Sequence, residues 1–271
     1  MTGLSPLAPG VYAWLADEPG HGRANAGVVV DEDGITVIDS LAVPSQYESF
    51  ATEVESLGMR VKRLVLTSSN AEFAGGTARF RLAAIYGRPQ ASAHLDQPPD
   101  ASVLRRLYPD LAAELDEEWT TRPVSHVIDA GVQLTPATTV LPYRGQQAEN
   151  LVVVVPGAQI VFAGAMAAFG VTPLAYQGDP AAWADALDEV VNLAPIVVPG
   201  IGPIGGEEEV RDLQGYLRAC VAAGGEPDAI PAGPWDAWSG REHDAINVER
   251  AAMVARGDDG IPPTLLARLG L

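Results

Sequence analysis

The chain has 271 residues, and 47% of them are hydrophobic, which suffices for the core of one large domain or two small ones. Its 35 acidic and 17 basic residues give a net charge of −18. Because sustained contact with phosphates needs clustered cations, we expect neither a nucleic-acid partner nor an anionic membrane partner. One cysteine, Cys220, and four scattered histidines exclude a disulfide framework and zinc motifs built from neighbouring Cys or His pairs.

The first residues carry no basic stretch followed by an apolar one, and no run of about 18 apolar residues occurs in the chain. We therefore expect a cytoplasmic protein. A lone cysteine fits that reducing compartment, and the helical pattern around Cys220 predicts a buried side chain without a chemical role.

The first half of the chain is predicted to be rich in strands. β-Branched residues between turn formers predict strands at 10–16, 26–30, 35–40, 61–69, 83–87 and 91–94. A Pro at the start, apolar residues at three-to-four spacing and a Gly at the end predict an amphipathic helix over 44–58. A short helix over 75–83 and a charged helical segment over 100–118, broken by Pro109, complete this half.

The second half repeats this order of elements. Strands are predicted at 125–134, 138–143, 151–157, 159–164 and 195–200, and helices at 181–191, 207–224 and 243–257. Strands in groups with helices between them predict an α/β protein in which two β-sheets lie face to face with helices on both outer faces, an αββα sandwich. No linker separates the halves, so we expect a single domain over residues 1–271 with a helical tail over about 225–271.

Five segments in order resemble the metallo-β-lactamase fold superfamily, in particular its bacterial hydrolase-like members. They are NAGVVVDEDGITVIDS, LVLTSSNAEFAGG, YRGQQAENLVVVVPG, QIVFAGAM and IVVPGIGP. The second stands where the family has a strand ending in T-H-x-H-x-D-H-x-G-G. The tail, with Trp238, His243, Asn247 and Arg250, resembles the closing helix of the family. The resemblance covers nearly the whole chain and implies the αββα fold.

The positions that the resemblance assigns to metal ligands all carry other residues. The family's His, His, Asp, His, His, Asp and His are here Ser68, Asn70, Glu72, Phe73, Gln146, Ala165 and Ile201. Zinc prefers imidazole, thiolate and carboxylate ligands, and a catalytic site needs three of them, so we expect no catalytic zinc and no other cofactor. A hard cation such as Mg²⁺ or Ca²⁺, held by Asp39, Glu72 and amide oxygens, stays as an alternative.

The glycines and prolines around these positions are retained, which predicts that the cleft keeps its shape. Glu72 is the candidate proton-transfer group, because burial beside Phe73 is expected to raise its pKa. Ser68, Ser69 and Asn70 form a polar cluster for orienting substrate oxygens. Ser69 lacks a histidine at the neighbouring motif positions, so serine-nucleophile chemistry is not expected.

Other candidates lie around this cleft. His21, in a loop that leans over the active cleft in resembling proteins, is a candidate proton shuttle. Asp39 is expected to hydrogen-bond amides around Thr67. Gln146 and Gln147 are expected to bind Ser68, Asn70 and Glu72 in place of a metal. Further substrate contacts are assigned to Phe73, Tyr143, Met166 and Ile201, whereas His94, His126 and His243 are expected to be structural.

Three functions stay open at this point. The first is a metal-independent enzyme that performs an elimination, isomerisation or cyclisation on a small organic molecule. The second is a non-catalytic ligand-binding or scaffold protein, since Phe73, Ala165 and Ile201 fill a cleft rather than use it. The third is a hydrolase with an altered metal site. A homodimer is compatible with each of them.

Overall fold

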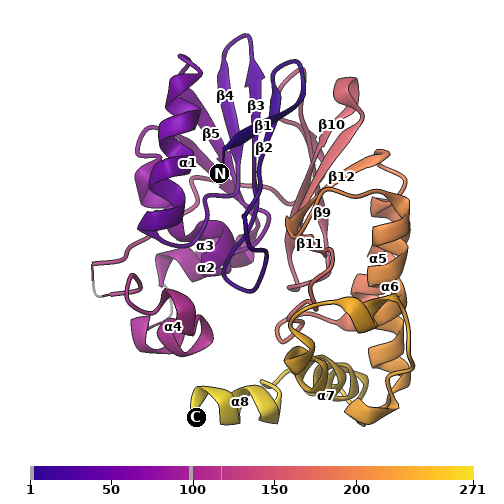
Figure 1. Cartoon of the computed structure of the whole chain (residues 1–271). Coiled ribbons are helices and arrows are strands. Elements are labelled where there is room, and N and C mark those ends of the chain that lie inside the picture. The colour runs from indigo at the N-terminus through magenta and orange to yellow at the C-terminus, as the bar shows by residue number, and fades with distance from the viewer. Residues whose placement is uncertain (1–2, 98–99, 117) are drawn as a thin grey trace.

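The computed structural model describes residues 3–97, 100–116 and 118–271 and contains two β-sheets that pack face to face (Figure 1). Their strands are β1 (Leu4–Ala8), β2 (Val11–Trp14), β3 (Ala26–Asp31), β4 (Gly34–Ile38), β5 (Val61–Val65), β6 (Ala84–Gly87) and β7 (His126–Val127) in the first sheet, and β8 (Val132–Gln133), β9 (Thr139–Tyr143), β10 (Asn150–Val155), β11 (Ile160–Ala168) and β12 (Ile196–Ile201) in the second. Strand order follows the chain in the first sheet and is β12-β11-β10-β9-β8 in the second.

Helices cover the outer face of each sheet, which confirms the predicted αββα sandwich (Figure 1). The first half contributes α1 (Pro44–Ser56), α2 (Ala71–Ala74), α3 (Pro89–Asp96) and α4 (Ala101–Leu107), and the second α5 (Pro180–Val190), α6 (Glu207–Ala222), α7 (Asp244–Ala255) and α8 (Pro263–Leu269). Short 3-10 helices lie at Gly75–Arg79, Pro109–Leu111, Pro156–Ala158, Pro227–Ala229, Pro234–Ala237 and Arg241–His243. Within the described residues, no helix is both long and apolar enough to cross a bilayer.

Three apolar clusters form the layers of the sandwich. Ile38 and Val65 of the first sheet pack against Val153 and Phe162 of the second to form the layer between the sheets. A second cluster joins α1 to the outer face of the first sheet. A third joins α5 and α6 to the second sheet and contains Cys220, which is buried as expected. Alternation of apolar residues along the strands therefore decides which side chains face which layer.

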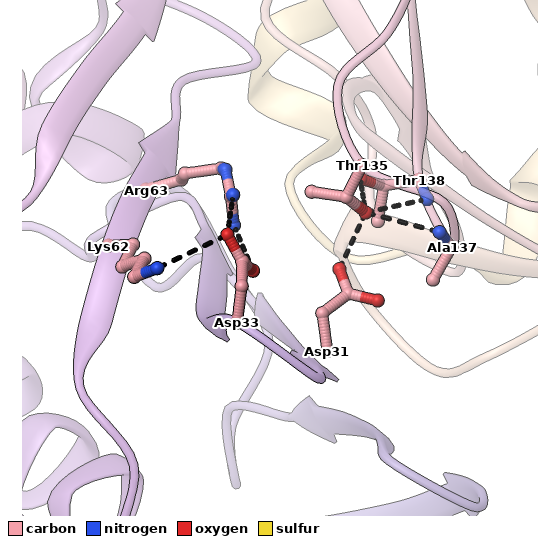
Figure 2. Close-up of polar contacts among 7 residues, drawn as sticks. All are labelled: Asp31, Asp33, Lys62, Arg63, Thr135, Ala137 and Thr138. Carbon is pink, nitrogen blue, oxygen red and sulfur yellow. Dashed lines mark hydrogen bonds and ion pairs between the residues drawn. The ribbon is translucent and has the colours of Figure 1, made fainter.

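The two sheets are also joined by polar contacts near the turn between β3 and β4 (Figure 2). The Thr135 hydroxyl donates to Asp31 Oδ2 at 2.5 Å and accepts the amide N–H groups of Ala137 and Thr138. Asp33 in the same turn pairs with Lys62 and Arg63 at the start of β5. These contacts lie at the amino ends of β4 and β5, so the opposite ends of both strands lead into the polar segments described below.

Several elements differ from the sequence-based expectation. Residues 91–94 belong to helix α3 and not to a strand, because Pro89 begins a helix there. The segment 125–134 divides into β7 and β8, which belong to different sheets. β1 and α8 were not predicted; β1 contains Pro6, which an edge strand tolerates. The expected helical segment 100–118 is reduced to α4 and a 3-10 turn, and its Glu117 lies outside the described residues.

Candidate functional site

The candidate site begins where β4 and β5 end. Asp39 has a positive φ of 61° and is buried; its carboxylate accepts the amide N–H of Thr67 at 2.8 Å and the Thr67 hydroxyl at 2.7 Å. These bonds confirm the role expected for Asp39, and burial raises its pKa to about 8. Gly164 has a φ of +50°, and a Cβ there would lie 2.2 Å from Thr67 Oγ1. Only glycine therefore lets β11 approach the Thr67 loop this closely.

A network of side-chain amides and hydroxyls follows Thr67. Gln147 Oε1 accepts the Ser68 hydroxyl at 2.8 Å and the Ser69 amide N–H at 3.1 Å, and its Nε2 donates to Asn70 Oδ1 at 2.9 Å. Gln146 Oε1 is 3.3 Å from the Ser68 hydroxyl. The expected network is thus present for Ser68 and Asn70.

The carboxylate of Glu72 is bound by a different segment from the one expected. Its Oε2 accepts the amide N–H of Gly22 at 2.8 Å and lies 3.4 Å from His21 Nδ1, whereas neither glutamine binds it. Gly22 has a φ of +84°, and a Cβ there would lie 2.8 Å from the Tyr108 ring. Glycine at this position allows the loop to fold over Glu72. The carboxyl group is buried, and burial raises its pKa to about 7.

His21 contacts Glu72 through one ring nitrogen and packs against two other rings. Its ring stacks on Tyr108 with centroids 4.6 Å apart and meets the edge of His243 at 5.5 Å. Burial, with the positive potentials of His243 and Arg268, lowers the pKa of His21 to about 3, so its imidazole is neutral. His21 Nε2 is buried and has no hydrogen-bond partner among the described residues. The ring therefore presents one nitrogen to Glu72 and one free nitrogen.

Two cavities meet at His21. The inner one has a volume of about 20 Å³, which is room for one water molecule. Its lining is His21, Glu72, Gln146 and Thr172, together with the apolar Phe73, Ala165, Ala167, Ala168, Val171, Pro173, Leu174, Trp183 and Ile201. The outer one opens to the surface and measures about 300 Å³; residues of the segments 18–23 and 107–111 line it, with Glu242, His243 and Arg268.

The structure brings most of the predicted site residues together. Glu72, His21, Phe73, Gln146 and Ile201 line the inner cavity, and Ser68, Ser69, Asn70 and Gln147 form the adjoining network.

Two predicted contacts lie elsewhere, against helix α5. Met166 is fully buried, and its carbonyl accepts the indole N–H of Trp183. Tyr143 packs on the cluster under α5, where burial and the nearby charge of Glu189 raise its pKa. Neither side chain lines the inner cavity.

Two groups beside the site had no signal in the sequence. Ser69 Oγ lies 2.8 Å from His94 Nδ1, so a histidine from outside the motif positions is within hydrogen-bond distance of this serine. The sequence pattern predicts a strand at 91–94, whereas the helix formed there turns His94 toward Ser69. Tyr108 and Arg268 line the outer cavity, yet nothing in their local sequence relates them to His21.

No family model and no curated protein matches the chain. Solved structures do. It is similar to the metallo-β-lactamase FIM-1 from Pseudomonas aeruginosa in its mono-zinc form, with a TM-score of 0.64 and 18% identity over 85% of this chain and 97% of that one. The chain has the metallo-β-lactamase fold. A metallo-β-lactamase from Erythrobacter litoralis gives a TM-score of 0.60 and 20% identity over 79% of this chain and 95% of that one. A metallo-β-lactamase from Hirschia baltica gives a TM-score of 0.61 and 17% identity over 80% of this chain and 97% of that one.

The residues of this metallo-β-lactamase fold do not offer a zinc site. Across the described ranges, no group of three or more His, Cys, Asp or Glu side chains is placed to hold a metal ion. Of the residues that the structure describes, Glu72 supplies the one carboxylate lining the inner cavity, and Phe73, Ala165 and Ile201 contribute hydrocarbon. The remaining oxygens are neutral amides and hydroxyls, which bind zinc poorly. The donor set therefore does not fit a catalytic zinc ion.

Proposed function

We propose that this protein is a metal-independent enzyme that transfers a proton on a small organic molecule by means of Glu72 and His21. The observation that carries the proposal is the buried Glu72 carboxylate, 3.4 Å from His21 Nδ1, in a ring of apolar side chains. A carboxyl group with its pKa raised to about 7 is close to half ionised at neutral pH, so it accepts and returns protons readily.

The proton passes between Glu72 and the substrate through the His21 ring. Burial makes a charged imidazolium costly, as the lowered pKa of His21 indicates. A neutral ring avoids that cost when a proton arrives at Nε2 while another leaves Nδ1 for the Glu72 carboxylate. The free Nε2 is the atom that this step requires.

The substrate is assigned to the outer cavity. Its volume of about 300 Å³ is at the lower end of the range for small-molecule sites, whereas the inner cavity of about 20 Å³ holds only water. His21 lines both cavities and connects the substrate to Glu72. Elimination, isomerisation and cyclisation each begin with a proton removed from carbon or oxygen and end with one returned, so they fit a single carboxylate–imidazole pair.

A second candidate function is a non-catalytic binding or scaffold protein. The small inner cavity favours it, because Phe73, Ala165 and Ile201 occupy space that a substrate would need if it bound there. In that case, Glu72 would bind only the Gly22 amide N–H and fix the loop.

A screen of small metabolites for thermal stabilisation separates the two. Any molecule that binds the native state raises its melting temperature, so stabilising compounds are then incubated with the protein and followed for conversion. The proposal predicts that wild type and Glu72→Gln bind the same compound and that Glu72→Gln converts it at least about 100-fold more slowly. Glu226→Gln, at an exposed position, is the matched control. Binding without conversion by wild type would support the scaffold function instead.

A further inference from the structure

Ser69 and His94 form a second pair of reactive side chains outside the inner cavity. Ser69 lies in the loop after β5, His94 lies in the last turn of α3, and the distance from Ser69 Oγ to His94 Nδ1 is 2.8 Å. Both residues are partly exposed to solvent. Neither residue takes part in the proton transfer proposed above.

One loop positions both members of this pair. Gln147 accepts the Ser69 amide N–H at 3.1 Å, and its Nε2 lies 3.0 Å from Ser69 Oγ. Glu149, two residues later, accepts the amide N–H of Gln90 in the first turn of α3 at 2.6 Å. The serine loop and the histidine helix are therefore fixed to the same short segment. This anchoring maintains the Ser69–His94 geometry and does not depend on the contact itself.

The imidazole is in the form that a base requires. Burial lowers the pKa of His94 below its ordinary 6.5, so the ring is neutral at pH 7 and one nitrogen has a free lone pair. Ser69 Oγ has two acceptors in reach, His94 Nδ1 at 2.8 Å and Gln147 Oε1 at 3.2 Å. In the tautomer that has its lone pair on Nδ1, the shorter contact directs the hydroxyl proton to His94.

A second serine–histidine contact in the chain provides an internal comparison. Ser125 Oγ lies 3.0 Å from His126 Nδ1, but its hydroxyl also binds the backbone of Ile85, accepting the N–H at 2.8 Å and donating to the carbonyl at 3.1 Å. The Ser125 hydroxyl therefore has two acceptors at nearly the same distance, the His126 imidazole and the Ile85 carbonyl. Both serines lie near a histidine, but the imidazole is nearer than the competing acceptor by 0.4 Å for Ser69 and by only 0.1 Å for Ser125.

We propose that Ser69 is a nucleophile activated by His94 and that the pair transfers acyl groups from small activated esters to water. Ser69 Oγ attacks the carbonyl carbon while its proton moves to His94 Nδ1, and the carbon–oxygen bond to the alcohol breaks as that proton passes to the alcohol. Water then attacks the acyl-serine and gives its proton to His94; the carbon–Oγ bond breaks, the acid departs, and the proton returns to Ser69. The net reaction is ester plus water to acid plus alcohol.

The test labels the full-length protein with a fluorophosphonate probe, which phosphonylates activated serines. The labelled protein is then digested, and peptide mass spectrometry locates the adduct. We expect the adduct on Ser69, no adduct on Ser125, and none on Ser69→Ala. We expect His94→Gln to label at least about 100-fold more slowly and His126→Gln to label at the wild-type rate. The same ranking is expected for hydrolysis of p-nitrophenyl acetate.

A pH profile keeps the test decisive if His94→Gln does not fold. The wild-type labelling rate is expected to fall at acid pH, as His94 gains a proton, with a midpoint below about 6.5. An adduct on Ser125 as abundant as that on Ser69, a His94→Gln rate equal to wild type, or a flat profile between about pH 5 and pH 8 would each overturn the proposal. A Ser69 adduct in a protein that converts no metabolite would uphold this inference and leave the Glu72 proposal unsupported.

Discussion

Replacing Glu72 with glutamine is expected to stabilise the protein above neutral pH. Burial raises the pKa of Glu72 from 4.5 to about 7. Between these pH values the folded state retains a proton that the unfolded chain has released. The free energy of unfolding therefore falls as the pH rises from about 4.5 to about 7 and the contribution is constant above that range.

The size of the effect follows from the shift in pKa. Relative to a side chain that does not titrate, Glu72 costs the folded state about 3 kcal/mol at pH 8, where it is ionised, and about 1 kcal/mol at pH 5, where it retains its proton. Glutamine is neutral, has nearly the same shape, and its carbonyl oxygen still accepts the Gly22 amide N–H. The glutamine variant gains further stability at high pH through Asp39. The charge of Glu72 is one of the causes that raise the pKa of Asp39, and the variant lacks that charge.

Urea denaturation of wild type and Glu72→Gln at pH 5 and pH 8 measures this difference. We expect Glu72→Gln to be more stable by about 3 kcal/mol at pH 8 and by about 1 kcal/mol at pH 5. Glu226→Gln, at an exposed position, should have the same free energy of unfolding as wild type at both pH values. A Glu72→Gln protein less stable than wild type at pH 8 would mean that the partners of Glu72 stabilise its buried charge, which is the opposite of the effect predicted.

Three further predictions concern the metal, the link between the halves, and the loop. Protein dialysed against metal-free buffer should hold zinc well below one equivalent by elemental analysis, and a chelator should leave its melting temperature unchanged; one retained equivalent contradicts the donor-set argument. Asn25→Ala should lower the free energy of unfolding by about 2–4 kcal/mol in urea, because Asn25 donates to the Pro199 and Gly202 carbonyls and accepts the Ala16 amide N–H; a loss below about 0.5 kcal/mol would show that these bonds are replaced by water. Gly22→Ala should lower the melting temperature and, by releasing Glu72 to solvent, move its titration midpoint toward 4.5; an unchanged midpoint would mean that the loop does not bury the carboxylate.

The layers of this fold follow from the sequence because each is encoded locally. Alternating or continuous apolar runs mark the strands, and the glycine and proline residues mark their ends. The same holds for the contact between Asp39 and Thr67, which each stand at the end of a predicted strand. Strand β1 was missed since Pro6 interrupts its pattern, although an edge strand tolerates proline.

The candidate site was only partly predictable, because its contacts join distant segments. Sequence indicated that Glu72 is buried, but the loop that binds it depends on Gly22 folding under Tyr108. The contact between Ser69 and His94 depends on residues 89–96 forming a helix, and a short segment of mixed propensity did not reveal this. Such contacts are set by tertiary packing and not by local pattern.

Proton transfer by Glu72 is tested most directly by an infrared titration of the carboxyl groups in wild type and Glu72→Gln, recorded with a chelator present. The difference between the two proteins isolates Glu72 from Asp39 and the other acids. If burial raises the pKa of Glu72 as the structure indicates, its protonated-carboxyl band is present at pH 5 and disappears with a midpoint near 7. A midpoint close to the ordinary value of 4.5 would contradict it, because Glu72 would then be permanently ionised at neutral pH and unable to exchange a proton with His21.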